Sequence, residues 1–310
     1  MSGASLDPAV GLVIEARARP VGNVSVARLI PVAQRRHLGP FVFLDHLGPV
    51  SFAPGGGFDV APHPHIGLST VTYLFKGEAL HRDSLGSVQL IRPGELNLMT
   101  AGRGVVHSER SEPAWRARGG TLHAAQLWLG LPREHEEDQP SFEHHAAEAL
   151  PSVQLRGATV RVLMGQAYGE RSPVRHPARP LLLELEVEAG ASLALPLDRP
   201  AGQEEARGAL PGEHALFIVE GAISIGVGSS AARFERNRLL VFNASVPVVV
   251  SADQHSRCLL LGGPRLDGER FIDWNFVSSS KERSARAKAE WRAQSFPRVP
   301  GDEDEFIPLP

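Results

Sequence analysis

Residues 57–77 read GFDVAPHPHIGLSTVTYLFKG, and residues 99–109 read MTAGRGVVHSE. The first stretch contains His-Pro-His and the second ends in His-Ser-Glu, so each offers two metal-binding side chains separated by one residue. Successive side chains of a β-strand point to opposite faces, so residues two apart point the same way. Four donors therefore converge if the two strands face each other inside a barrel. Imidazole nitrogen and carboxylate oxygen suit iron, nickel, copper, zinc and manganese. The candidate metal ligands are His63, His65, His107 and Glu109.

A His-x-His pair is weak evidence by itself, because about 0.5 such pairs are expected by chance among 13 histidines in 310 residues. The ordinary alternative for each histidine is a hydrogen-bonded side chain near a turn. The flanking residues favour a metal site. Gly57, the two histidines, Thr70 and Gly77 follow one another at the gaps of the first cupin motif, and Gly104 to His107 resembles the end of the second. Cupins are jelly-roll-like β-barrels, so the resemblance also implies a fold.

Thr70 stands where the general cupin motif has a carboxylate ligand, which a hydroxyl cannot replace. The carboxylate is found instead at Glu109, two residues after His107, which is the arrangement of the pirin family. The chain resembles pirins from about residue 20 to 130, and more loosely through its second half. The stretches that carry the resemblance are GPFVFLDHLGP (39–49), HPH (63–65), TVTYLF (70–75), MTAGRGVVHSE (99–109), QLW (126–128) and EFIPLP (305–310), the last as in bacterial members.

The resemblance to pirins implies a cofactor and an activity. It implies one Fe²⁺ ion held by the three histidines and Glu109, and some members of the family act on quercetin as dioxygenases. Three further residues in the pirin-like stretches are candidates for supporting the ligands from outside the ligand set: His81, Asp45 and Arg103.

Each of these three residues has a structural alternative. His81 could orient a ligand or a bound water, or it could be a turn histidine paired with Asp83. Asp45 is more simply explained by bonds to backbone amides. Arg103 lies between two glycines and could bond loop carbonyls. Apolar residues near the ligands could keep water away from the site; the candidates are Val60, Ile66, Leu98, Met99 and Val106.

Glycine (31) and proline (25) are spread along the chain, and short β-type runs lie between them. Short strands separated by turn residues are typical of a sandwich or barrel. With the cupin resemblance, this predicts an all-β protein of two tandem cupin barrels and a short C-terminal helix. We expect a metal-binding barrel over residues 1–140, a barrel without metal ligands over 141–278, and a helix and tail over 279–310 that pack on the barrels. The runs are 68–75, 88–91, 122–129, 160–164, 181–187, 215–219, 239–242 and 246–250.

The predicted C-terminal helix begins at a capping box, with Ser279 as N-cap and Glu282 reaching back, and runs to about Gln294. An apolar stripe of Ala285, Ala289 and Ala293 would form its buried face, extended by Trp291. The apolar end of the chain, residues 306–310, should dock on the protein. The charged stretch 132–152 could bind metal, but a solvated linker between the barrels is the favoured interpretation.

A second metal site is not expected. Gly221 follows its strand as Gly77 does, and counting back at the same gaps places Arg207 and Ala209 at the two histidine positions. The second barrel is therefore interpreted as structural, or as a docking surface.

The composition excludes several classes of protein. The net charge is −3 and the sequence pI is about 6.5, whereas a nucleic-acid-binding domain would show a basic face. The single cysteine, Cys258, cannot form an internal disulfide, and its apolar surroundings predict a buried, inert thiol. The sequence shows no signal peptide or apolar span. We expect a cytoplasmic protein without direct nucleic-acid or membrane contacts.

Two functions from different classes remain open. Three histidines and one carboxylate leave coordination positions free, so a chelating small molecule could reach the ion. The first hypothesis is a flavonol (quercetin) dioxygenase. The second is a metal- or redox-dependent regulatory protein that binds a protein partner, as a transcription cofactor or an enzyme modulator, without physiological turnover.

Overall fold

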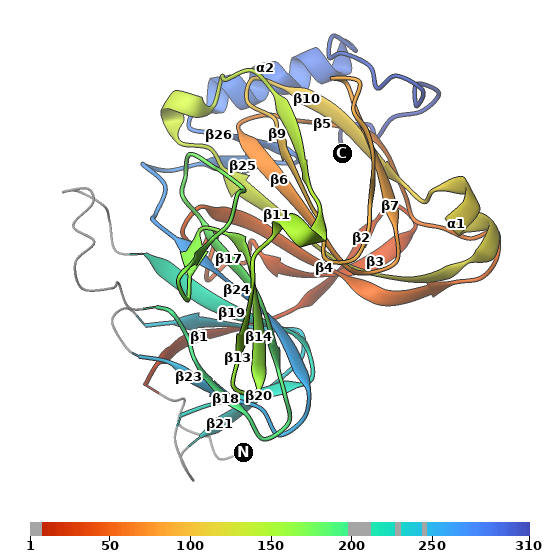
Figure 1. Ribbon diagram of the computed structural model, residues 1–310. Helices are drawn as coiled ribbons and strands as arrows, with labels where there is room; N and C mark the ends of the chain where they lie inside the picture. The colour runs from red at the N-terminus through yellow and green to blue at the C-terminus, as the bar shows by residue number, and fades with distance from the viewer. Residues whose placement is uncertain (1–7, 198–211, 227–230, 244–246) are drawn as a thin grey trace. The chain divides into compact units, whose positions relative to one another are not determined.

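Figure 1 shows the computed structural model of the protein, which describes residues 8–197, 212–226, 231–243 and 247–310. Within these residues the chain is built mainly from β-strands, with α-helices only at α1 (Pro113–Arg118) and α2 (Lys281–Arg292). Seven of the eight predicted β-type runs lie on strands, and the eighth, 246–250, overlaps one although residue 246 lies outside the described residues. The prediction of an all-β fold with a short C-terminal helix is confirmed.

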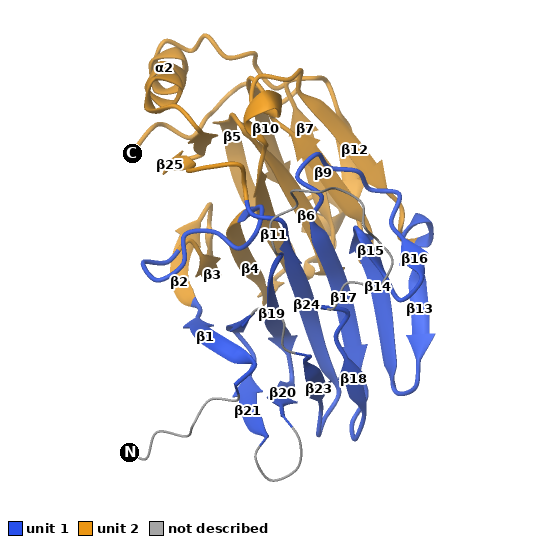
Figure 2. Ribbon diagram, turned by 90° about the vertical axis from the view of Figure 1, so that its left-hand side faces the viewer, with its two compact units in different colours: residues 1–16, 32–41, 148–265 blue, residues 17–31, 42–147, 266–310 orange. Residues whose placement is uncertain are grey.

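The chain divides into two compact units, coloured separately in Figure 2. Unit 1 comprises residues up to 16, 32–41 and 148–265, and unit 2 comprises residues 17–31, 42–147 and 266–310. This differs from the consecutive division expected from sequence. Strand β1 (Val10–Glu15) pairs with β22 (Arg238–Phe242) and so belongs with the second half of the chain, while the segment after residue 265 belongs with the first. Local periodicity carries no signal for such long-range pairing.

Unit 2 contains a seven-stranded and a four-stranded sheet, both antiparallel where their pairings are described. The seven-stranded sheet has the order β12-β9-β6-β11-β4-β3-β2, and the four-stranded sheet has the order β5-β10-β7-β8. Their strands are β2 (Arg17–Val21), β3 (Val24–Ile30), β4 (Phe41–Phe52), β5 (Asp59–His65), β6 (Leu68–Lys76), β7 (Ala79–Asp83), β8 (Val88–Ile91), β9 (Leu96–Thr100), β10 (Val105–Arg110), β11 (Gly120–Gly130) and β12 (Ser141–His145).

Strand β12 corrects the interpretation of residues 132–152 as a solvated linker. It pairs with β9 along its whole length and so completes the edge of the seven-stranded sheet. Phe142, between Ser141 and Glu143 on this strand, stacks on His81 at 4.4 Å between ring centroids. Two short 3₁₀ turns flank it, η1 (Arg133–His135) and η2 (Ala147–Ala149). The many charged residues correctly indicated that most of these side chains lie at the surface, but they gave no indication that the segment contains a strand.

Unit 1 is also built from a seven-stranded and a four-stranded sheet, with the orders β1-β22-β19-β24-β17-β14-β13 and β18-β23-β20-β21. Its core is aliphatic and includes Leu216, Leu260 and Cys258. Burial raises the pKa of the Cys258 thiol, in agreement with the predicted inert cysteine. The strands not yet given are β13 (Ser152–Leu155), β14 (Ala158–Met164), β15 (Gln166–Ala167), β16 (Glu170–Arg171), β17 (Leu181–Val187), β18 (Ser192–Ala194), β19 (Glu213–Glu220), β20 (Ala222–Ile225), β21 (Ala232–Glu235), β23 (Val249–Ser251) and β24 (Ser256–Gly263).

The C-terminal segment adds a hairpin, β25 (Phe271–Asp273) and β26 (Phe276–Ser278), and helix α2 to unit 2. The helix is capped by Ser280, whose hydroxyl accepts a hydrogen bond from the backbone of Arg283 at 3.1 Å, so the predicted N-cap at Ser279 was wrong by one residue. The predicted alanine stripe was also wrong. The buried face consists of Ser284, Ala287 and Trp291, because the bulk of Trp291, packed on aromatic residues, decides which face turns inward.

The end of the chain docks on unit 2, as predicted. The backbone N–H of Ile307 donates to the carbonyl of Pro62 at 2.9 Å, and the indole of Trp291 donates to the carbonyl of Ile307 at 3.0 Å. Arg110 adds a two-pronged hydrogen bond to Asp302, with both distances 2.9 Å. Among the helices described, none has the length and apolar character needed to cross a membrane.

Candidate metal centre

The histidines predicted as ligands lie on two paired strands of the four-stranded sheet. Strands β5 and β10 are antiparallel, and His107 is the direct partner of His63. The alternation of side chains turns His65 to the same side as His63. Each of the three histidines offers a ring nitrogen, and these atoms lie within 4.8 Å of one another. In the part of the chain that the structure describes, this is the only such group of three; Arg207 and Ala209 lie outside that part.

Outer hydrogen bonds fix the tautomers of two of these rings. The Nδ1 atom of His63 lies 2.9 Å from the carbonyl oxygen of Ala61, and Nδ1 of His65 lies 3.1 Å from that of Asn275. A carbonyl oxygen can only accept, so both Nδ1 atoms carry the proton and both Nε2 atoms keep a lone pair. This outer contact is the usual one for metal-binding histidines. His107 lacks it, since its buried Nδ1 has no hydrogen-bond partner among the residues that the structure describes.

The three imidazoles suit a metal cation better than a proton. The Nε2 atoms of His65 and His107 are 3.1 Å apart, which is a hydrogen-bonding distance; since Nε2 of His65 keeps a lone pair, Nε2 of His107 is the donor. Burial lowers the pKa of His63 to about 4 and the pKa values of His65 and His107 well below the ordinary value. The rings are therefore neutral near pH 7, which is the form that binds metals. The donor set fits a mononuclear site of the kind predicted.

Glu109 lies beside this group without being part of its tightest cluster. The β5–β10 register shifts between His107 and Glu109, and Glu109 pairs with His81 on β7. The carboxyl group lines the same cavity as the histidines. Burial raises its pKa to about 7, since a charged carboxylate is poorly solvated there. We propose Glu109 as the fourth ligand.

The three candidate supporting residues have different surroundings. Nε2 of His81 donates a hydrogen bond to the carboxylate of Asp83 at 2.9 Å, and His81 also lines the cavity, so both alternatives for it describe part of its environment. Asp45 lines the cavity as well, but its partner is the guanidinium of Arg28, at 2.8 and 2.7 Å, rather than backbone amides. Arg103 is exposed and does not line the cavity, so it does not join the other two.

The cavity lined by the three histidines and by residues of the seven-stranded sheet has a volume of about 450 Å³, within the range usual for small-molecule sites. Of the five apolar residues proposed to exclude water, Val60 lines it. Ile66 and Val106 pack instead in the cluster that contains Trp291 of α2. Most of the wall is apolar; it includes Val26, Phe43, Leu47, Phe58, Leu74, Ile91, Leu122, Ala124 and Trp128.

Part of the wall comes from the C-terminal segment and was not predicted. Ile272, Trp274 and Asn275 of the β25–β26 hairpin line the cavity, as does Ile307. The hairpin turn places the Asn275 carbonyl on His65, and Trp274 adopts a positive φ of 56° there. Neither residue belongs to a ligand motif, so only the fold reveals their place.

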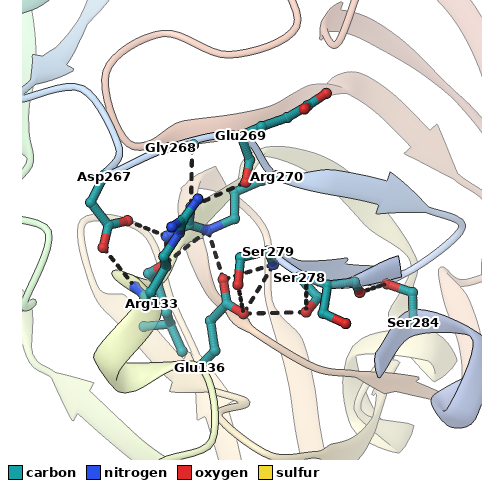
Figure 3. Close-up of polar contacts among 11 residues, drawn as sticks. Arg133, Glu136, Asp267, Gly268, Glu269, Arg270, Ser278, Ser279 and Ser284 are labelled. Carbon is teal, nitrogen blue, oxygen red and sulfur yellow. Dashed lines mark hydrogen bonds and ion pairs between the residues drawn. The ribbon is translucent and has the colours of Figure 1, made fainter. Parts of the chain in front are cut away.

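A buried ion pair holds this hairpin, as Figure 3 shows. Arg270, directly before β25, contacts Glu136 at 2.7 Å, and the two side chains are 1% and 7% exposed. Glu136 also accepts hydrogen bonds from the backbone and hydroxyl of Ser279 at 3.0 Å, directly after β26. Arg270 is further bonded to Asp267 and to the carbonyl of Leu131. The carboxylate of Glu136 thus contacts the residues at both ends of the hairpin and links them to the segment that follows β11.

Comparison with known proteins agrees with this architecture. The Pirin family model matches residues 23–129, and the model of the Pirin C-terminal cupin domain matches residues 183–297. A pirin-like protein from Caulobacter vibrioides is 43% identical over 97% of this chain and 99% of its own length. Pirin from Homo sapiens is 29% identical over 86% of each chain. The crystal structure of a quercetin 2,3-dioxygenase from Acinetobacter baumannii gives a TM-score of 0.86 at 30% identity, covering 96% of this chain and 94% of that one. The chain therefore belongs to the pirin family.

Proposed function

We propose that this protein is a mononuclear non-haem iron dioxygenase that acts on flavonols such as quercetin. The observation that carries the proposal is the convergence of three neutral, buried imidazoles on a cavity large enough for a small molecule. A purely structural metal site would be closed by its ligands, whereas this one faces a space of about 450 Å³. The relative from Acinetobacter baumannii, described as a quercetin 2,3-dioxygenase, supports the choice of substrate class.

We assign His63, His65, His107 and Glu109 to hold one Fe²⁺ ion. When bound, the ion would act as a Lewis acid that favours the anionic form of a chelating flavonol, and as a conduit for electrons to dioxygen. The side chains that line the cavity would position the substrate and exclude water. Phe43 and Trp128 stack at 3.9 Å between ring centroids and offer a broad aromatic surface to a flat ligand. The apolar lining excludes bulk water from the reacting face.

The iron-loaded protein should consume dioxygen when it is given quercetin, because the proposed ligand set leaves room for a chelating substrate. Oxygen uptake and loss of quercetin absorbance should proceed together. Protein stripped of metal by a chelator is the control and should show neither. Fully metallated protein that consumes no oxygen with several flavonols would contradict the enzyme proposal, and would favour the regulatory binding function instead.

A further inference from the structure

We propose that Gln126 is a specificity-determining residue, whose side-chain amide donates a hydrogen bond to an oxygen atom of the substrate remote from its metal-chelating edge. The proposal rests on the function proposed above and extends it to the opposite wall of the same cavity. Gln126 belongs to β11 of the seven-stranded sheet, whereas the histidine ligands belong to the four-stranded sheet. Its role would be to select among flavonols that share the same chelating group.

The side chain of Gln126 faces the cavity. Leu122, Ala124, Gln126 and Trp128 alternate along β11 and all line the cavity, while Ala125 and Leu127 between them are 0% exposed. Gln126 itself is half-buried, so part of it is accessible within this space. In an otherwise apolar stretch of strand, a polar side chain at an inward position needs a hydrogen-bonding partner.

Thr72 fixes the orientation of the Gln126 amide. The two residues are direct partners across β6 and β11, and the Thr72 hydroxyl donates to Oε1 of Gln126 at 2.9 Å. This is the one hydrogen bond of the Gln126 side chain within the described residues. With its oxygen taken, the amide presents two N–H donors on the other side. The cavity therefore carries a fixed donor for which the described part of the chain provides no acceptor.

The neighbouring polar side chains on this sheet are already engaged or inaccessible. Arg28 is paired with Asp45 and lies over the ring of Phe43 at 4.4 Å from its centroid. Asn97, next to Thr72 on β9, lines the cavity and accepts a hydrogen bond from His144 at 2.8 Å. Its amide nitrogen has no partner among the described residues, but it is buried and the residue is only 3% exposed, so this donor is less accessible to a ligand than that of Gln126. Gln126 is therefore the best placed donor on this wall for a ligand.

Trp128 relates this donor to the metal site. Its ring meets the ring of His65 edge to face, with 5.0 Å between centroids. Gln126 lies two residues away on the same face, which corresponds to about 7 Å along the strand. A flat ligand that chelates beside His65 and lies along the aromatic wall would bring an oxygen on a distant ring to Gln126. Because the amide donates, that oxygen must accept, as a phenolic or carbonyl oxygen does.

The test is a binding series on iron-loaded protein under anaerobic conditions, measured by titration calorimetry. The probes are quercetin, kaempferol, galangin and fisetin, which keep the 3-hydroxyl and 4-carbonyl but differ in their other hydroxyls. For the wild type, removal of one particular hydroxyl should weaken binding about tenfold, as expected for a lost neutral hydrogen bond. In Gln126→Leu the parent flavonol should bind about tenfold more weakly, and removal of the same hydroxyl should then change binding less than about twofold.

Two further variants separate recognition from structure. Gln126→Glu keeps the side-chain shape but replaces the donor by an oxygen, and should also lose the discrimination. Gln154→Leu is the matched control, because Gln154 accepts from Thr159 in the same cross-strand arrangement but is exposed and outside the cavity; it should bind like the wild type. Equal losses for all probes in Gln126→Leu, or an unchanged pattern of discrimination, would overturn the role of Gln126 while leaving the dioxygenase proposal intact. If no flavonol binds the wild type, both proposals fail.

Discussion

The His107→Ala protein should fold, contain almost no metal and consume no dioxygen with quercetin. His107 supplies one of the three imidazoles that converge in the described part of the chain, and its removal should cost more than the roughly 10–100-fold in metal affinity typical of changes outside the ligand set. The fold should survive, because β10 keeps its backbone pairing with β5 and β7 and the cores of both units remain. His63→Ala and His65→Ala should behave alike, and Glu109→Ala should lose less metal because three imidazoles remain.

Metal content, circular dichroism and oxygen uptake on the same samples would check this. His135→Ala is the matched control, since His135 bonds Asp138 on the surface and does not line the cavity. It should retain metal and activity. Unfolding of the single variants would mean that the ion is structural, as in small zinc domains. Normal metal content in His107→Ala would mean that His107 is not a metal ligand.

The Glu136→Ala protein should lose about 3 kcal/mol of unfolding free energy, because the change removes the buried one of the two carboxylates paired with Arg270 and also removes the acceptor of the Ser279 backbone N–H. Denaturant unfolding measures the effect. The adjacent Glu137 provides the control: it pairs with Arg283 but is 56% exposed, so Glu137→Ala should cost no more than about 1 kcal/mol. Equal losses of unfolding free energy in the two variants would show that burial does not determine how much the Glu136–Arg270 pair stabilises the fold.

The grouping of the three histidines could be predicted from sequence because the signal is local. A spacing of two on a β-strand places His63 and His65 on one face, and the structure brings them to His107. The same alternation explains a failure. Val60 was correctly expected to line the cavity, whereas Ile66, which directly follows β5, and Val106, which directly precedes His107 on β10, pack in the cluster that contains Trp291 of α2. Without the strand register, nearness in sequence did not indicate which side chains face the cavity.

The rest of the site depends on contacts between distant segments. The hairpin that carries Trp274 and Asn275 reaches the cavity only because the chain returns to unit 2 after residue 265. In the sequence, Glu136 lies within a charged stretch that indicates surface. In the structure it is buried, because it pairs with Arg270 and accepts a hydrogen bond from the backbone of Ser279. Composition cannot reveal that a single member of a charged run has a buried partner elsewhere in the chain.

The most direct test of the metal centre is the anomalous scattering of iron in crystals of the iron-loaded, untagged protein. One peak per chain is expected, in the cavity of unit 2, within bonding distance of a ring nitrogen of each of the three histidines and of a carboxylate oxygen of Glu109. A peak held by other residues, a second peak of equal height in unit 1, or histidines without iron in metal-saturated crystals would contradict it.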